Sequence, residues 1–146
     1  MERRNKMDYL TDLANDEEID SYGQSLQDFF AQKMDVDRFT ATRLQMGIYG
    51  QRQDGVNMVR IKVPGGRLIS SQWEAIADVT EKYVQSGEAH VTTRQDIQLH
   101  YVPLADTPAV IRHLAKGGLT TREACGNTIR NVTACPLTAV CSREHT

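Results

Sequence analysis

Two alternating segments on either side of a turn, within residues 89–102, constrain the fold of this chain most strongly. Successive side chains of a β-strand point to opposite faces of the sheet, and apolar residues here occupy every second position. A plain exposed strand face carries lysine, glutamate, serine and threonine in no fixed order. This one gathers a hydroxyl, a guanidinium, an amide and an imidazole, from Thr92, Arg94, Gln98 and His100. Such a face suits a large polar anion, although an ordinary solvated strand face is the simpler alternative.

The flanking sequence predicts an α+β fold of the ferredoxin-like, split βαβ kind, with an antiparallel sheet covered by two helices on one face. The order is strand, helix, strand, strand, helix and a short final strand. The strands are predicted at 58–63, which Pro64-Gly65-Gly66 ends, and at 89–94, 97–102 and 119–123. The first helix opens with the capping box Ser71-x-x-Glu74 and stops at Gly87, and the second runs from Thr107-Pro108 to Gly117.

In this topology the first and third strands are neighbours, so Arg60 and Lys62 should lie beside Gln98 and His100. A three-residue turn at 95–97 would place Arg94 opposite Gln98 and Thr92 opposite His100. A two-residue turn would scatter the polar set, because a slip of one residue reverses a strand's faces. The helices should cover Val59, Ile61, Val63 and Val91.

We expect three regions along the chain: an N-terminal arm and lead-in at 1–56, the ferredoxin-like half-domain at 57–124, and the start of a further module at 125–146. The arm is polar and acidic, and Leu26, Phe29, Phe30 and Met34 have helical spacing. We interpret it as a helical or partly extended arm outside the core, followed by loop with short structured pieces over residues 38–56. Trp73 is most simply a core residue.

Composition excludes several classes of function. The net charge of −2 gives no indication of a nucleic-acid partner, and no apolar run approaches the roughly 20 residues of a membrane span. The first residues are not followed by the apolar stretch of a signal peptide. An odd count of three cysteines in such a chain favours the reducing cytoplasm.

A second polar stretch runs from Cys125 to Pro136 and has the composition of a loop lining a polar site. Within it, Arg130 has the forked guanidinium that binds an oxyanion. Three cysteines without a paired knuckle make a poor zinc site, and an iron–sulfur cluster normally takes four thiolates. We therefore assign no metal ligand.

Together, four segments resemble the sirohaem-dependent nitrite and sulfite reductases over residues 38–141. They are Gly47-Ile48-Tyr49-Gly50-Gln51-Arg52-Gln53, Met58-Val59-Arg60-Ile61-Lys62-Val63-Pro64-Gly65-Gly66, Thr92 to His100, and Gly126 to Pro136. That family reduces nitrite to ammonia, or sulfite to sulfide, with sirohaem coupled to a 4Fe-4S cluster. Some sulfite-reducing members carry arginine at the position of His90, and a histidine there does not choose between the two substrates.

The resemblance implies a role for nine residues. Arg60 and Arg130 would hold the substrate oxyanion and support protonation of its leaving oxygens. The others would hold the carboxylate-rimmed sirohaem: Lys62, Thr92, Thr93, Arg94, Gln98, His100 and Asn131. Asn131 would contact the macrocycle or orient its neighbour.

The family's cluster cysteines lie far downstream, and Cys135-x5-Cys141 only imitates them. We therefore expect a fragment, a truncated gene product or one piece of a split enzyme, inactive alone. Its partners would be the remaining half of the reductase and an electron donor such as ferredoxin or a flavoprotein. One alternative is a non-catalytic ferredoxin-like module that binds an anionic tetrapyrrole or another anion. Another is a structural domain with a coincidental polar face.

Overall fold

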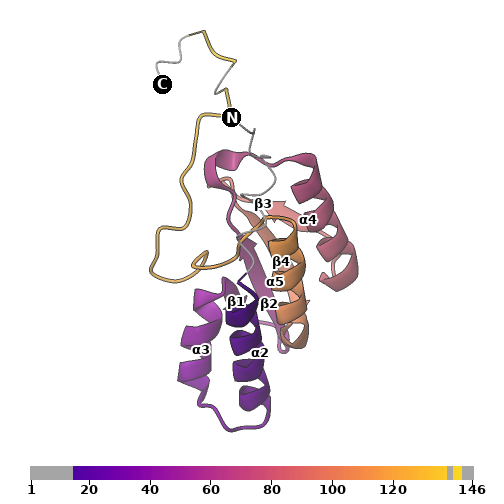
Figure 1. The fold of residues 1–146 in the computed structure, drawn as a ribbon, viewed down its shortest axis with the longest axis vertical. Coiled ribbons are helices and arrows are strands. Elements are labelled where there is room, and N and C mark those ends of the chain that lie inside the picture. The colour runs from indigo at the N-terminus through magenta and orange to yellow at the C-terminus, as the bar shows by residue number, and fades with distance from the viewer. Residues whose placement is uncertain (1–14, 138–139, 143–146) are drawn as a thin grey trace, which may run out of the picture.

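The computed structural model describes residues 15–137 and 140–142, which fold around one antiparallel sheet (Figure 1). The helices are α2 (Asp16–Phe30), α3 (Val36–Gln45), α4 (Ser70–Tyr83) and α5 (Thr107–Lys116). The strands are β1 (Ile48–Gly50), β2 (Val56–Ile61), β3 (Ala89–Val91) and β4 (Ile97–Pro103), in the spatial order β1-β2-β4-β3. Among the described helices, none combines the length and the apolar character needed to cross a bilayer.

The predicted α+β, ferredoxin-like arrangement is confirmed. In the sheet, β2 and β4 are antiparallel neighbours, with Val59 opposite Leu99 and Arg60 opposite Gln98. One face of the sheet is apolar and is packed into a core with α4 and α5, where burying each large side chain contributes about 1.5–3 kcal/mol. The central members of this core are Val59, Ile61, Ile76, Val79, Leu99, Val110 and Leu114.

The fourth strand comes from before the half-domain predicted at 57–124, not from its end. The predicted strand at 119–123 is reduced to one bridge, in which the Lys62 N–H donates to the Thr120 carbonyl at 2.9 Å. β1 occupies the other edge of β2, in a region where we expected loop with short structured pieces. Gly47 makes this route possible, because a Cβ there would lie 2.0 Å from the Thr121 carbonyl oxygen.

The turn between β3 and β4 lies two residues earlier than predicted. His90, not Arg94, lies opposite Gln98, and the Thr92 N–H donates to the Asp96 carbonyl at 2.8 Å. The loop has the predicted three residues, 93–95, but the predicted pairs of Arg94 with Gln98 and Thr92 with His100 are wrong. The pairing moves by an even number of residues, so Gln98 and His100 stay on the open face with Arg60, as predicted.

Two residues predicted for the core are exposed. Val91 is 72% exposed because β3 is a three-residue edge strand, and Trp73 is 50% exposed on the outer side of α4. α4 begins one residue before the predicted capping box. The side-chain Oε1 of Gln72, not that of Glu74, accepts the Ile69 N–H at 3.1 Å.

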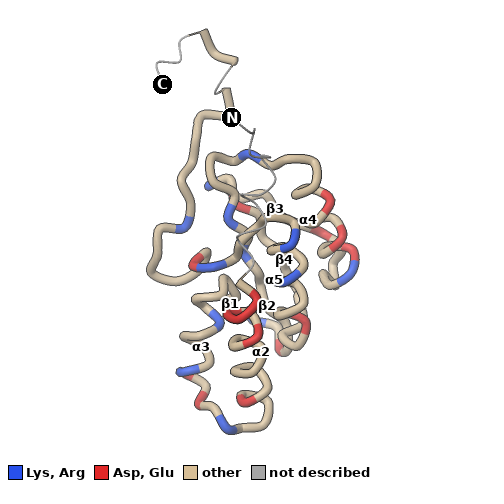
Figure 2. The backbone as a smooth tube through the Cα atoms, in the orientation of Figure 1, with Lys and Arg blue, Asp and Glu red and all other residues tan. Residues whose placement is uncertain are grey.

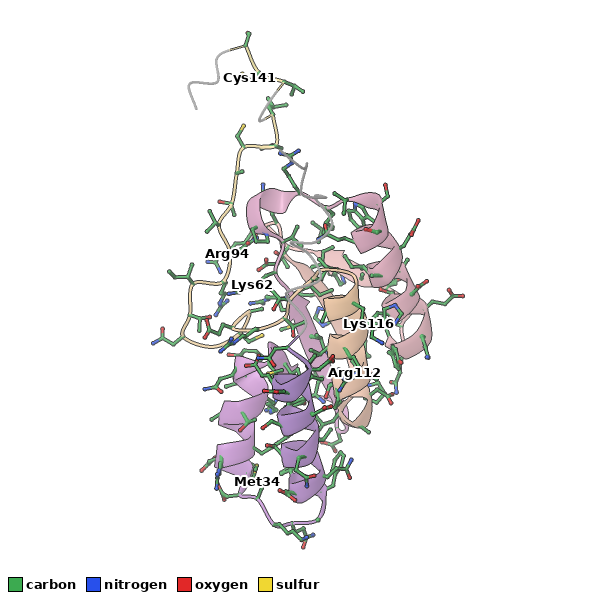
Figure 3. All side chains as sticks on the ribbon, in the orientation of Figure 1. Met34, Lys62, Arg94, Arg112, Lys116 and Cys141 are labelled. Carbon is green, nitrogen blue, oxygen red and sulfur yellow. The ribbon has the colours of Figure 1, made fainter. Side chains whose placement is uncertain are left out.

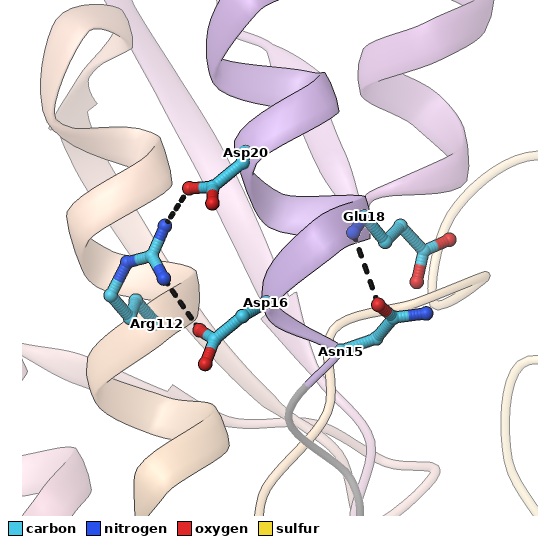
Figure 4. A network of polar contacts seen from close by, with 5 residues as sticks. All are labelled: Asn15, Asp16, Glu18, Asp20 and Arg112. Atoms are coloured by element: carbon cyan, nitrogen blue, oxygen red, sulfur yellow. Dashed lines mark hydrogen bonds and ion pairs between the residues drawn. The ribbon is translucent and has the colours of Figure 1, made fainter.

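The N-terminal region is helical, as one of the two alternatives predicted, but the expectation that it stays outside the core is wrong. Tyr22 and Leu26 of α2 are buried, and so is Phe39 of α3. Polar contacts add to this packing: the Arg112 guanidinium of α5 contacts the carboxylates of Asp16 and Asp20, each at 2.5 Å (Figure 4). Residues 16–45 therefore share one core with the half-domain.

Candidate anion-binding site

The turn at 92–96 is organised by the Thr92 side chain. Its Oγ1 accepts the N–H of Arg94 at 3.3 Å and the N–H of Asp96 at 3.0 Å. Gln95 completes the turn in the left-handed region, at φ +64°. This hydrogen bonding moves Thr92 and Arg94 out of the strand, and it leaves the Thr92 hydroxyl proton free to donate to a ligand.

A polar row crosses the open face of the sheet from β2 to β3 and consists of Arg60, Gln98 and His90. In the amide orientation that pairs donor with acceptor, the Gln98 oxygen accepts Arg60 Nε at 3.0 Å and also contacts Nη2. Arg60 Nη1 donates to the carbonyl of Ala124 at 3.3 Å. The guanidinium is therefore held at both ends.

His100 lies next to this row on β4. Its ring centroid is 5.4 Å from that of His90, with the two rings nearly perpendicular. Burial lowers the pKa of His100, and the nearby His90 and Arg60 lower it further. The neutral imidazole is therefore favoured at neutral pH, and it can donate one N–H.

Residues 126–137, which we call the strap, run along the end of the sheet next to this turn (Figure 1). Hydrogen bonds with the half-domain hold it, and two side chains make four of them. Asn131 Nδ2 donates to the carbonyls of Val63 at 3.0 Å and Arg94 at 2.8 Å. The Gln95 side chain pairs with both backbone groups of Ala134, at 2.7 and 3.0 Å. These contacts fix the segment that carries Arg130.

Lys62 and Arg94 lie on the side of the molecule that the strap passes (Figure 3). Lys62 does not reach the cavity described below: its Nζ donates to the strap carbonyl of Ile129 at 3.2 Å. Basic residues gather where the strap runs beside the sheet (Figure 2). The strap and the open sheet face therefore bring several cations together.

A cavity of about 490 Å³ opens between the strap, the turn and the open sheet face. Three arginines and one aspartate are among its lining residues, so cationic groups predominate. The lining consists of Arg60, His90, Val91, Thr92, Thr93, Arg94, Asp96, Gln98, His100 and Arg130. Seven of the nine residues expected from the family resemblance are in this set, whereas Lys62 and Asn131 hold the strap instead.

Sequence reasoning did not assign His90 and Asp96 to the site. The signal for His90 was available, because it lies two residues before Thr92 on the same strand face. Asp96 is 2% exposed, and burial raises the pKa of its carboxyl, an effect that the Val63 N–H and nearby cations such as Arg60 oppose. Its burial follows from the corrected register, which sequence alone did not provide.

The donor set fits a ligand that carries several carboxylates. Guanidinium, hydroxyl, amide and imidazole groups all offer N–H or O–H donors, and charge-assisted bonds from guanidinium to carboxylate are among the strong hydrogen bonds of proteins. The volume lies within the usual range for small-molecule sites, about 300–1,000 Å³. The site can therefore bind and orient an anion.

Known proteins are similar to this chain in sequence. Residues 49–117 match the nitrite/sulfite reductase ferredoxin-like half domain. The chain is 33% identical over 100 residues to a ferredoxin–nitrite reductase of Leptolyngbya laminosa, an alignment that covers 68% of this chain and 20% of the relative. It is 32% identical over 123 residues to the chloroplastic ferredoxin–nitrite reductase of Arabidopsis thaliana, covering 83% of this chain and 21% of the relative. The chain thus spans about a fifth of the length of these relatives.

Among solved structures, the NirA protein of Mycobacterium tuberculosis has a similar fold, with a TM-score of 0.69 and 22% sequence identity. The match covers 94% of this chain and 28% of that one. It therefore extends well beyond residues 49–117.

Proposed function

Because residues 49–117 of this chain are a ferredoxin-like half-domain of the nitrite/sulfite reductase family, we propose that it supplies the first part of the sirohaem and substrate site of a ferredoxin-dependent nitrite reductase. The observation that supports this most is the convergence of seven expected residues on one cavity of about 490 Å³. Nitrite and ferredoxin are favoured over sulfite and a flavoprotein because the relatives described above are ferredoxin–nitrite reductases.

Sirohaem, when bound, supplies the redox-active iron at which the oxyanion is reduced. The residues of this chain bind and orient the sirohaem and the oxyanion. Thr92 donates its free hydroxyl proton, and Arg94 adds a guanidinium from the same turn. Gln98 and His100 border the same space from β4, so that the turn and the strand together hold the carboxylate rim.

Arg60 and Arg130 hold the substrate oxyanion. Gln98 and the Ala124 carbonyl fix Arg60, and the strap contacts fix the segment around Arg130. Lys62 and Asn131 act through Arg130 as positioning residues. Lys62 donates to the strap carbonyl of Ile129, and Asn131 of the strap donates to the carbonyls of Val63 and Arg94. Preorganised cations of this kind stabilise negative charge that develops on an oxyanion without moving during the reaction.

In our proposal, the ligands of the 4Fe-4S cluster are supplied by residues outside these 146. Such a cluster takes four thiolates, and the chain has three cysteines. One of them, Cys125, is buried, and burial raises the pKa of its thiol, which disfavours the thiolate. The 146 residues alone are therefore expected not to reduce nitrite.

Complementation tests this proposal. A ferredoxin–nitrite reductase that lacks the region matched by this chain is mixed with the chain, loaded with sirohaem and assayed for ammonia production from nitrite. We expect a haem-like absorption band and activity only in the mixture. A mixture with neither the band nor the activity would count against the proposal, provided that the unmodified relative shows both.

A non-catalytic module that binds an anionic tetrapyrrole by itself is the second candidate. One observation favours it: this chain alone brings seven of the expected residues to one cavity. It predicts sirohaem binding by the isolated chain, with loss of binding in Arg94→Ala. Binding by the isolated chain without activity in the mixture would favour this module over the reductase.

A further inference from the structure

β4 contains an irregularity next to the site. Val59 lies opposite Leu99, but Asn57 lies opposite Val102, so β4 has one extra residue between these pairs. Tyr101 takes up the difference at φ +58°, in the left-handed region that side chains other than glycine rarely adopt. Such bulges re-aim the neighbouring side chains, and here the neighbour is His100.

Gln51, which follows β1, contacts both residues of this irregularity. Its Oε1 accepts the Tyr101 N–H at 2.7 Å, and its Nε2 lies 3.5 Å from Nδ1 of His100. The short bond to the backbone fixes the orientation of the carboxamide. With the amide reversed, its NH2 group would face the Tyr101 N–H, donor against donor, and the 2.7 Å bond would be lost.

The fixed amide determines which nitrogen of His100 carries the proton. The NH2 group of Gln51 can only donate, so Nδ1 must accept and therefore carries no hydrogen. The 3.5 Å contact is long for a hydrogen bond, but no other described residue bonds to the ring. The remaining nitrogen, Nε2, then carries the proton and is free for a ligand.

The charged and titratable groups around the ring agree with a neutral imidazole. His90 faces its edge, Arg60 lies on the adjacent strand, and the Tyr101 ring centroid is 6.4 Å away. No carboxylate pairs with His100 among the described residues. Burial, His90 and Arg60 all lower its pKa.

We propose that Gln51 is a positioning residue that holds His100 as the neutral tautomer with its proton on Nε2, so that the ring offers a single N–H donor to an anionic ligand of the cavity. The role toward the ligand rests on the proposed function. The tautomer rests only on the contacts of Gln51 and is tested without any ligand.

Nitrogen NMR of the histidine-labelled, ligand-free chain tests the tautomer directly, because the two ring nitrogens give distinct signals when one of them is protonated. We expect His100 to show the Nε2–H form at neutral pH, with the resonance assigned by its loss in His100→Gln. An Nδ1–H form in the wild-type chain would overturn the proposal without any further variant.

Gln51→Glu then tests the cause. A carboxylate of the same shape still accepts the Tyr101 N–H, but it turns the partner of Nδ1 from a donor into an acceptor. We expect the proton to move to Nδ1 and the pKa of His100 to rise relative to Gln53→Glu, which adds the same charge at an exposed neighbour. Gln51→Leu should leave a mixture of tautomers. A His100 signal that is the same in all three variants would refute the role of Gln51, whatever the outcome of the reductase assay.

Discussion

The attachment of the strap gives a prediction with a calculable size. Asn131 Nδ2 donates to the carbonyls of Val63 and Arg94, at 3.0 and 2.8 Å. Asn131→Asp keeps the shape and replaces both donors with acceptors. Each lost hydrogen bond costs about 0.5–1.5 kcal/mol net, so we expect a loss of about 1–3 kcal/mol. Because the strap lies at the end of the fold, this loss should appear as local opening of the strap rather than as global unfolding.

Gly65 reports this opening, because its N–H donates to the strap carbonyl of Val132 at 2.7 Å. Amide hydrogen exchange at Gly65 should accelerate about 5- to 100-fold in Asn131→Asp, given that about 1.4 kcal/mol corresponds to a factor of ten. Asn127→Asp is the matched control, since it adds the same charge to an exposed position of the strap. Equal exchange rates at Gly65 in the two variants would refute this reasoning.

Three further predictions concern the core, the buried acid and the thiols. Leu99→Ala should lower the free energy of unfolding by about 2–5 kcal/mol in urea denaturation. Val91→Ala, at a position 72% exposed, should change it by less than about 0.5 kcal/mol. Equal losses in the two variants would contradict the exposure of Val91. The raised pKa of Asp96 means that the native state holds this proton more tightly than the unfolded chain, so wild-type stability falls as pH rises from the ordinary value of 3.8 through the raised one. Thermal melts should therefore show Asp96→Asn gaining stability relative to wild type over that window, and a relative loss would contradict the sign. Mass spectrometry after thiol labelling should find exposed Cys135 modified in the folded chain and buried Cys125 modified only after unfolding; rapid labelling of Cys125 in the native chain would be inconsistent with its burial.

Alternation of side chains was sufficient to predict that one residue of β2 and two of β4 share the open face. It placed Arg60 beside Gln98 and His100, because the period of a strand and the split βαβ topology leave few alternatives. It was not sufficient for the register at the turn. The Thr92 hydroxyl accepts two backbone N–H groups there, and this local bonding ended β3 before Thr92 and Arg94.

The N-terminal helices show a different limit. The spacing of Leu26, Phe29, Phe30 and Met34 predicted a helix, but the buried face of α2 is Ile19, Tyr22 and Leu26. These three residues lie among acidic and polar neighbours, so the sequence did not show them as one buried face. What covers such a face depends on the tertiary partners, in this case α3 and α5. The same holds for β1, whose three residues form a strand only because β2 lies next to them.

The most direct test of a carboxylate-binding cavity is the amount of sirohaem retained by the complemented reductase when Arg94 is replaced. Loss of one charge-assisted hydrogen bond costs about 1.5–3 kcal/mol, which corresponds to about 10- to 100-fold weaker binding. An absorption titration should show this loss for Arg94→Gln and no change for Arg52→Gln, which removes the same charge from an exposed residue outside the cavity. Equal sirohaem affinity in the two variants would contradict the assignment of this cavity.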